Sequence, residues 1–357
     1  MVRTPETTAS WAGSTRRLGR LSTATVMVWL AVAAIGAGVL ALGFGRLAIP
    51  PDVVVRILAS QIVPLEAGWS GTEQQIVEAV RAPRVLLSML VGAGLACAGA
   101  VLQGVLRNPL VSPQILGVQS GASFGGALAL LLGASSVLLV GGAFAFGFLA
   151  LIAAMVLSKV HGRRTVLMLI LAGIVVGGFF AALVSGVTYL ADPEENLPSI
   201  VFWLLGSLAT ATWDKVAIAA LPVLAGVATM LVLRWRINIL ALGDDDARAL
   251  GVEPAVLRWV LLCSAAVVVA GTVAVGGVIT WVGLVIPHIV RMMLGPDNRV
   301  LIPACVFLGA AYLTVMDTAA RTLTASEIPL GVLTALVGAP IFFVVLRRTQ
   351  ARGWNDA

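Results

Sequence analysis

The chain has 357 residues, of which 59% are hydrophobic and 11% are charged, and its mean hydropathy is +1.02. Because soluble domains carry about 25% charged residues, this composition excludes a soluble globular protein and indicates an integral membrane protein. The formal net charge of +6 requires no nucleic-acid partner, since Lys and Arg are concentrated on one side of the predicted spans. The three cysteines, Cys97, Cys263 and Cys305, fall in separate apolar runs, and their spacing matches neither a disulfide framework nor a metal site.

Apolar runs close to the ~20 residues that cross a hydrocarbon core follow one another along the chain. We predict an all-α integral membrane protein with about ten transmembrane helices, at residues 26–49, 85–106, 115–132, 137–157, 166–190, 216–233, 256–275, 279–294, 301–316 and 328–346. A shorter apolar piece covers residues 200–208. The run at 279–294 is the weakest of the ten, because Pro287 interrupts it.

The same pattern divides the chain into three parts. Residues 1–22 form a basic cytoplasmic tail, residues 23–349 a ten-helix transmembrane domain, and residues 350–357 a C-terminal tail. Between the first two spans, residues 52–58 have the pattern of an amphipathic interfacial helix, and a second helical stretch starts at Glu73.

The second span carries a face of small residues. Gly92, Ala96, Ala100 and Gly104 recur at every fourth position, which places them on one side of a helix. In a membrane, such a face lets two helix backbones approach closely. We therefore expect this span to pack tightly inside the bundle.

The charge distribution predicts the orientation. An even number of spans puts both termini on one side, and in this topology 17 of the 23 Lys and Arg residues fall on that side and 6 on the other. Positive charge accumulates on the cytoplasmic side of membrane proteins. Both termini are therefore predicted to be cytoplasmic, in a multi-pass protein of the cytoplasmic (inner) membrane.

A short polar island interrupts the apolar pattern near residue 250. Three adjacent carboxylates cannot lie in lipid, where each Asp costs roughly 2.5–3.5 kcal/mol. The island predicts a small helix with an Asp as its N-cap, acids at its positive end and a glycine stop. It is either a docking element for a soluble partner or a solvated connector. Its residues are Gly243, Asp244, Asp245, Asp246, Ala247, Arg248, Ala249, Leu250 and Gly251.

Several kinds of chemistry are excluded by residues that the chain lacks. Its only lysines, Lys159 and Lys215, are each followed by Val, so no nucleotide-binding P-loop is present. His288 is expected to be a hydrogen-bonded structural residue, and no ligand spacing for a metal or haem is found. Asp317, the only acid in or at the edge of a span, is expected to pair with Arg321, which weakens an ion-coupled carrier. No catalytic nucleophile and base are evident.

Several motifs, in order along the chain, resemble the FecCD-type permeases of ABC importers, which carry iron-siderophores, haem or cobalamin. The resemblance extends from about residue 50 to residue 348. Residues 240–252 resemble the cytoplasmic coupling loop of that family, which here covers 236–256. The other matching segments are Arg81-Ala-Pro-Arg84, the Gly-rich stretch 91–104, the stretch 107–122 that begins Arg-Asn-Pro-Leu, and 276–291 and 327–340.

The resemblance implies roles for individual residues. Residues 243–251 would dock into a groove of a cytosolic ATPase. Arg81, Arg84 and Arg321 would meet carboxylates of a substrate-loaded binding protein, with interfacial snorkelling as the alternative. A cytoplasmic gate would comprise Asn108, Leu110, Thr165 and Val166, although Asn108 and the following proline also fit an ordinary turn.

The resemblance further implies a type II ABC importer architecture. Two permease chains, identical or paralogous, would surround a pathway lined by the fifth and tenth spans, above a cytosolic ABC ATPase dimer and below an extracytoplasmic substrate-binding protein. This chain would bind lipid and no cofactor of its own, because ATP and Mg²⁺ belong to the ATPase. The expected cargo is a ferric siderophore, with haem, cobalamin or an oxyanion as alternatives. An ion-gradient-driven carrier and a membrane scaffold that transports nothing are the competing functions.

Overall fold

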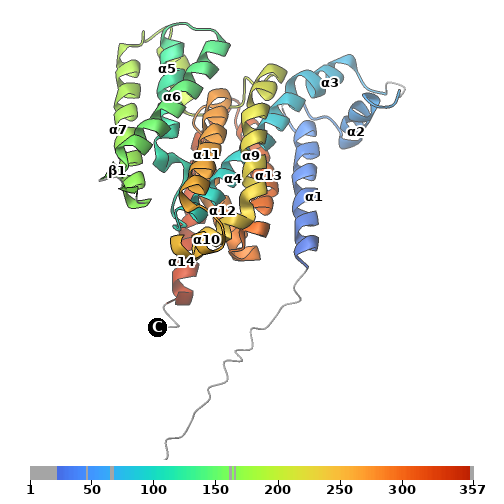
Figure 1. Ribbon diagram of the computed structural model, residues 1–357. Helices are drawn as coiled ribbons and strands as arrows, with labels where there is room; N and C mark the ends of the chain where they lie inside the picture. The colour runs from blue at the N-terminus through green and yellow to red at the C-terminus, as the bar shows by residue number, and fades with distance from the viewer. Residues whose placement is uncertain (1–21, 46, 65–67, 161–162, 165, 354–357) are drawn as a thin grey trace, which may run out of the picture.

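The computed structural model describes residues 22–45, 47–64, 68–160, 163–164 and 166–353, and these form one bundle of helices (Figure 1). The predicted tail at 1–22 lies outside the described residues except for Ser22, and α14 continues past residue 349 to Gly353. In chain order the elements are α1 (Thr23–Gly43), α2 (Pro51–Ser60), α3 (Gly71–Gln75), the π-helical η1 (Ile76–Arg81), α4 (Ala82–Val105), the 3₁₀-helical η2 (Pro113–Leu116), α5 (Val118–Leu131), α6 (Ser136–Leu157), β1 (Lys159–Val160), β2 (Arg163–Arg164), α7 (Val166–Leu190), α8 (Leu197–Leu204), α9 (Trp213–Leu242), α10 (Asp244–Ala249), α11 (Pro254–Gly276), α12 (Val282–Leu294), α13 (Asn298–Thr322) and α14 (Leu330–Gly353).

The all-α prediction is confirmed, apart from the small antiparallel pair β1–β2. Seven helices of the described chain are long and apolar enough to cross a membrane, and three further apolar helices are shorter, at Val118–Leu131, Val282–Leu294 and Leu330–Val344. Each predicted run thus contains a helix. The number of ten membrane crossings remains a prediction, because length and composition single out only the seven.

The region between the first two spans forms the predicted helices for local reasons. Helix α2 starts with Pro51, whose fixed φ suits a first helical residue, and it buries Val54. Helix α3 starts with a capping box: Ser70 Oγ accepts from Glu73 N at 3.2 Å, and Glu73 Oε2 accepts from Ser70 N at 2.8 Å. Local signals therefore set where both helices begin, and burial of Val54 packs α2 against the bundle.

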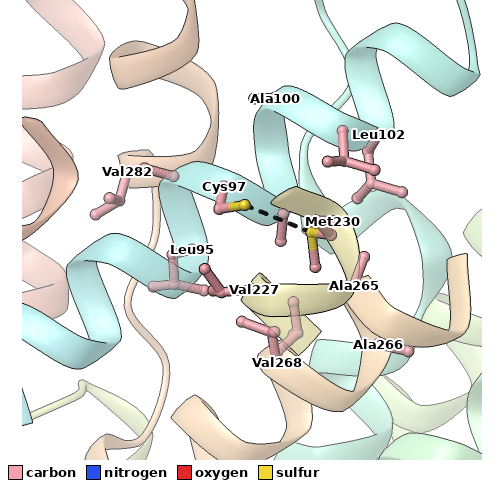
Figure 2. Close-up of a cluster of buried hydrophobic side chains, with 14 of the residues drawn as sticks. Leu95, Cys97, Ala100, Leu102, Val227, Met230, Ala265, Ala266, Val268 and Val282 are labelled. Atoms are coloured by element: carbon pink, nitrogen blue, oxygen red, sulfur yellow. Dashed lines mark hydrogen bonds between the residues drawn. The ribbon is translucent and has the colours of Figure 1, made fainter. Parts of the chain in front are cut away.

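Helix α4 is the central helix, and its small residues determine what packs on it. Helices α3, η1 and α4 form one continuous helical segment, Gly71–Val105, and 83% of the residues in its most apolar stretch are buried. A methyl group on Gly92 would overlap the carbonyl of Gly309 in α13, and one on Gly99 would overlap the carbonyl of Gly283 in α12. The predicted close approach of backbones is confirmed. Figure 2 shows the adjoining core, where Cys97 Sγ lies 3.6 Å from Met230 Sδ of α9.

The apolar run at 279–294 was expected to be interrupted at Pro287, but the interruption lies before the helix. Pro287 lies inside α12, whereas the break falls at residues 277–281, before the helix begins. Gly277 has φ +66°, and a methyl group there would overlap the carbonyl of Trp203. Only glycine fits such a position, so the chain leaves the helical path here rather than at the proline.

Three loops meet at this break and are joined by backbone hydrogen bonds. Ser207 N donates to Gly276 O at 2.9 Å, and Leu330 N donates to Gly206 O at 2.8 Å. Gly331 N donates to Leu205 O at 3.1 Å. These bonds satisfy backbone groups that would be costly to leave unpaired at membrane depth. They also connect the end of α8, the end of α11 and the start of α14.

The two ends of the bundle differ in what they carry. Figure 1 shows the start of α1, all of α10 and the end of α14 at one end, which we call the α10 end. Helices α2 and α3 lie at the opposite end, which we call the α2 end. The described parts of the chain nearest to both termini thus lie at the same end of the molecule.

The glycine contacts of α4 yield a stability prediction. Replacing Gly99 by Ala should destabilise the protein by about 1–3 kcal/mol, because the methyl group forces the α4 and α12 backbones apart. Gly36→Ala in α1 is the matched control, since nothing lies within 4 Å of the added methyl group. Thermal unfolding of the purified variants in detergent measures the difference. Equal midpoints for the two variants would contradict the role of Gly99.

Candidate functional site

The polar island forms the short helix α10, but its cap differs from the prediction. Gly243, with φ +135°, occupies the N-cap position, and no side chain caps the helix. The C-terminal stop is confirmed: Gly251 has φ +77°, its N–H donates to Arg248 O at 3.0 Å, and Val252 N donates to Ala247 O at 2.9 Å. This pair of bonds is a Schellman motif. The prediction of an Asp cap is wrong because the carboxylate of Asp244 binds arginines outside the helix instead of the first N–H groups of α10.

Asp244 anchors α10 to the rest of the bundle. Its carboxylate accepts from both Nη atoms of Arg258 in α11, with Nη1 to Oδ2 at 2.8 Å, and Arg107 Nη2 lies 3.3 Å from Oδ1. The hydrogen bonds from Arg258 hold the pKa of this carboxyl below its usual range. Asp244 therefore remains ionised at neutral pH, and its bonds weaken only when the pH falls through that lowered pKa.

The remaining residues of α10 divide into a buried side and an exposed side. Ala247 is fully buried against α9 and α11, whereas the side chains of Asp245 and Asp246 are exposed. Leu250 is 58% exposed and borders a groove of about 330 Å³ between the end of α9 and the start of α11. This end of the molecule thus presents carboxylates beside an apolar groove, a combination suited to a soluble protein partner.

Arg107 connects this helix to the predicted gate. It has φ +51°, an uncommon conformation for a non-glycine residue, and it donates to Leu240 O as well as to Asp244. The next residue, Asn108, accepts from Leu110 N at 2.9 Å and so forms a tight turn. The predicted gate turn is therefore attached directly to the residue that holds α10.

The other half of the predicted gate is only partly described. Thr165 lies outside the described residues, and Val166 begins α7, although its side chain is not described. The turn at 108–110 reaches α7 through η2 instead. A methyl group on Gly173 of α7 would overlap the carbonyl of Ile115 in η2, so these two elements are in direct backbone contact. The gate role of these residues stays a prediction.

The three predicted docking arginines lie together at the α2 end, inside the protein. Arg84 Nε donates to Asp317 Oδ2 at 2.9 Å, and its Nη2 donates to Glu327 Oε2 at 2.9 Å. Arg321 Nε lies 3.9 Å from Asp317 Oδ2, which places the expected local pair at the limit of an ion pair. The main partner of Asp317 is Arg84 in α4, which sequence spacing did not reveal.

Burial gives these arginines a structural role. Arg81, Arg84 and Arg321 are 4%, 7% and 7% exposed. Arg81 Nη1 donates to Leu42 O at 2.7 Å and to Gly43 O at 2.9 Å, and thereby holds the end of α1. The expectation of exposed guanidinium groups does not fit this conformation. Docking of a partner through the three arginines stays a prediction.

Four polar atoms buried near α12 have no hydrogen-bond partner within the described part of the chain. They are Gln103 Oε1, His288 Nδ1, Arg291 Nη1 and Tyr312 Oη. The hydrogen-bonded His288 expected from the sequence is therefore not found at Nδ1. Its ring instead makes an edge contact with Phe342 of α14, with the centroids 5.8 Å apart.

Sequence reasoning missed three residues that the structure makes central. Arg107 and Arg258 bind Asp244, and Glu327 binds Arg84. Arg107 and Glu327 both lie in motifs that resembled the family, but nothing in the local spacing pairs residues 137 or 243 positions apart. Arg258 was the easiest of the three to predict from sequence, because it follows the polar island at the start of the next helix.

Comparison with known proteins gives consistent matches over most of the chain. The model of the FecCD transport family matches residues 30–348. The molybdate import system permease protein MolB of Haemophilus influenzae is 44% identical over 318 residues, which cover 89% of this chain and 94% of that protein. A probable iron chelatin transport system permease protein of Helicobacter pylori is 38% identical over 275 residues, which cover 77% and 83%.

A solved structure matches the fold closely. It is described as an inward-facing conformation of an ABC transporter of proposed metal-chelate type. The TM-score is 0.82 and the identity 42%, with 90% of this chain and 99% of that chain covered.

The buried charge cluster yields a stability prediction. Asp317→Asn should destabilise the protein by about 3–5 kcal/mol, because it leaves the buried Arg84 with one carboxylate fewer. Asp52→Asn is the matched control: it removes an ion pair with Arg56 that is more than half exposed, and should change stability by about 1 kcal/mol or less. Thermal unfolding in detergent distinguishes the two. A small shift for both variants would show that the cluster is dispensable.

Proposed function

Because the chain belongs to the FecCD transport family, whose relatives named above are permeases of import systems, we propose that it is the permease subunit of an ATP-driven importer. Permeases of this family have no ATPase site of their own, so the energy comes from a separate subunit. The chain moves its cargo across the cytoplasmic membrane by alternating access. This requires each partner to bind the inward- and outward-facing states with different affinity.

The observation that carries this proposal is the link between α10 and the turn at 108–110. Helix α10 is the coupling helix: it docks on a cytosolic ATPase through the exposed Asp245, Asp246 and Leu250, beside the apolar groove. When nucleotide binding moves the ATPase, α10 transmits the displacement through Asp244 and Arg107. Arg107 is contiguous with the turn at 108–110, so motion of α10 reaches the gate without passing through the bundle core.

The orientation of the chain follows from this role. The α10 end faces the cytoplasm, in agreement with the excess of Lys and Arg predicted for that side. The start of α1 and the end of α14, which lie at that end, are then cytoplasmic. The substrate-binding protein docks on the α2 end. The buried arginines there support docking by holding the loop that carries Glu327 and the end of α1.

A second permease chain, identical or paralogous, completes the pathway. Helix α7 buries one face against α5 and α6 and leaves the other exposed. Leu171, Ile174, Val175 and Phe179 form that exposed face, which is apolar along its length. In a pair of chains, α7 and α14 line the passage. Because the exposed face of α7 is apolar, the passage binds the cargo weakly. Selectivity then lies in the binding protein.

The structure gives little support to a carrier driven by an ion gradient. Such carriers keep an ionisable group accessible near the bilayer midplane. Asp317 is only 2% exposed and accepts three hydrogen bonds from Arg84, two of them at Oδ1. A carboxylate held in this way is neutralised by a fixed arginine and does not exchange ions with either side.

The cargo is proposed from the relatives. The family resemblance favoured a ferric siderophore, but the 44% identity with the molybdate permease exceeds the 38% identity with the iron chelatin permease. We therefore place a molybdate-like oxyanion first and an iron chelate second. Both are metal-containing anions or chelates delivered by a receptor.

The coupling proposal predicts the effect of one carboxylate. In proteoliposomes that contain the ATPase and binding protein, Asp244→Asn should lower transport per ATP hydrolysed by about fivefold or more, the effect of roughly 1 kcal/mol on a two-state population. Asp245→Asn is the comparison variant: Asp245 belongs to the proposed docking surface and contacts only Arg248 within the described residues, so its loss should weaken ATPase association rather than lower transport per ATP hydrolysed. ATP hydrolysis and uptake are measured in parallel. Uptake under an imposed ion gradient without the ATPase would refute the importer assignment.

The cargo proposal predicts a preference. With the cognate binding protein, vesicles should accumulate labelled molybdate at least about tenfold faster than a ferric siderophore, a difference of ~1.4 kcal/mol in barrier height. Equilibrium binding of both cargoes to the isolated binding protein identifies where selectivity arises. Siderophore uptake without molybdate uptake would reverse the order proposed.

A further inference from the structure

A cavity of about 590 Å³ lies between α1, α2, α4 and the start of α9, beneath the α2 end. Its volume falls within the ~300–1,000 Å³ of small-molecule sites. Figure 1 shows α1 and α2 at the edge of the bundle opposite to α7, so the cavity lies away from the proposed passage. Its apolar walls are formed by Gly38, Leu42, Leu58, Val85 and Met89.

The opening of the cavity faces the surroundings of the bundle rather than its interior. Ile35 and Leu86 line it and are 63% and 44% exposed. Both belong to helices that are long and apolar enough to cross the membrane. A cavity with such walls is not filled favourably by water, whereas lipid acyl chains surround it on the open side.

The upper rim of the cavity carries one negative charge. Glu78 Oε1 accepts from Gln61 Nε2 at 2.7 Å and from Gln74 Nε2 at 3.0 Å. Oε2 of the same carboxylate has no hydrogen-bond partner within the described part of the chain. Trp213 also lies at the rim, where its Nε1 donates to the backbone oxygen of Glu78 at 3.1 Å. A tryptophan in this position is typical of the membrane–water interface.

Arg81, which is close to Glu78 in sequence, and Lys215, which is two residues from Trp213, are engaged elsewhere. Arg81, one turn further along the same helical segment, donates to carbonyl oxygens of α1. Lys215, in the first turn of α9, donates to Thr210 Oγ1 at 2.6 Å. The rim therefore offers a carboxylate oxygen to an external cation that can donate hydrogen bonds.

We propose that this cavity binds a membrane phospholipid with a primary ammonium headgroup. One acyl chain occupies the apolar cavity between α1 and α4, and the ammonium group binds Glu78 Oε2 at the rim. Phosphatidylethanolamine has this chemistry, whereas phosphatidylglycerol has no cation to offer. The lipid fills the space between α1 and α4 and so supports the packing of α1, a helix at the edge of the bundle. Because it binds the folded protein, it stabilises the bundle by mass action.

Native mass spectrometry of the full-length permease tests the proposal. The protein is delipidated in detergent and supplied with phosphatidylethanolamine or phosphatidylglycerol of identical acyl composition. We expect the ethanolamine lipid to be retained by a factor of about two to five over the glycerol lipid, the range that partly exposed ion pairs produce. Glu78→Gln should abolish this preference while acyl-chain binding remains.

A second pair of variants tests the cavity itself. Val39→Trp fills the cavity and should remove the retained lipid, whereas Val32→Trp, on the same helix but outside the cavity, should not. An unchanged elution profile in size-exclusion chromatography shows that each variant is folded, and Val39→Leu provides a milder filling if Val39→Trp aggregates. Equal lipid retention in the Val39 and Val32 variants would overturn the site. An ethanolamine preference that survives Glu78→Gln, or a preference for phosphatidylglycerol, would overturn the headgroup assignment.

Discussion

Backbone-to-backbone contact along α4 is the constraint on which the other features depend. In lipid, helices gain little from the hydrophobic effect, so they associate where small residues allow close packing. Gly92 admits α13, and Gly99 admits α12. These contacts set the depth and rotation of α4. They therefore also set the positions of Arg84, in its first turn, and of Arg107, two residues beyond its last residue.

The two charge clusters at the ends of α4 differ in what they contribute. At the α2 end, Arg84 and Asp317 are almost fully buried, so breaking their pair leaves a buried charge without its main partner and is costly. At the α10 end, Arg107 and Asp244 are each about two-fifths exposed, so their pair is weak and reversible. The strong cluster fixes the architecture. The weak one joins the turn at 108–110 to α10, the element that is proposed to move with the ATPase.

Much of the architecture could be predicted from sequence, because it depends on local patterns. The apolar runs located the spans, the small-residue face located the central helix, and Gly251 marked the end of α10. The pairing of Arg84 with Asp317 could not be predicted, because it joins residues 233 positions apart through the three-dimensional packing of α4 on α13. The same holds for Asp244, whose role as an anchor rather than a cap depends on Arg258 of the following helix. The break before α12 could not be predicted, because the sequence marks Pro287 as the interruption, whereas the positive φ of Gly277 appears only in the structure.

The hydrogen bonds among Ser207, Gly206, Leu330 and their partners have a mechanical consequence. They join the end of α8 to the end of α11 and to the start of α14, so these three helix ends are held together. In the proposed switch between inward- and outward-facing states, the chain bends outside these joined ends. Gly117, with φ +74°, and the turn at 108–110 lie between α4 and α5, where a change in backbone angles moves α5 without breaking these bonds.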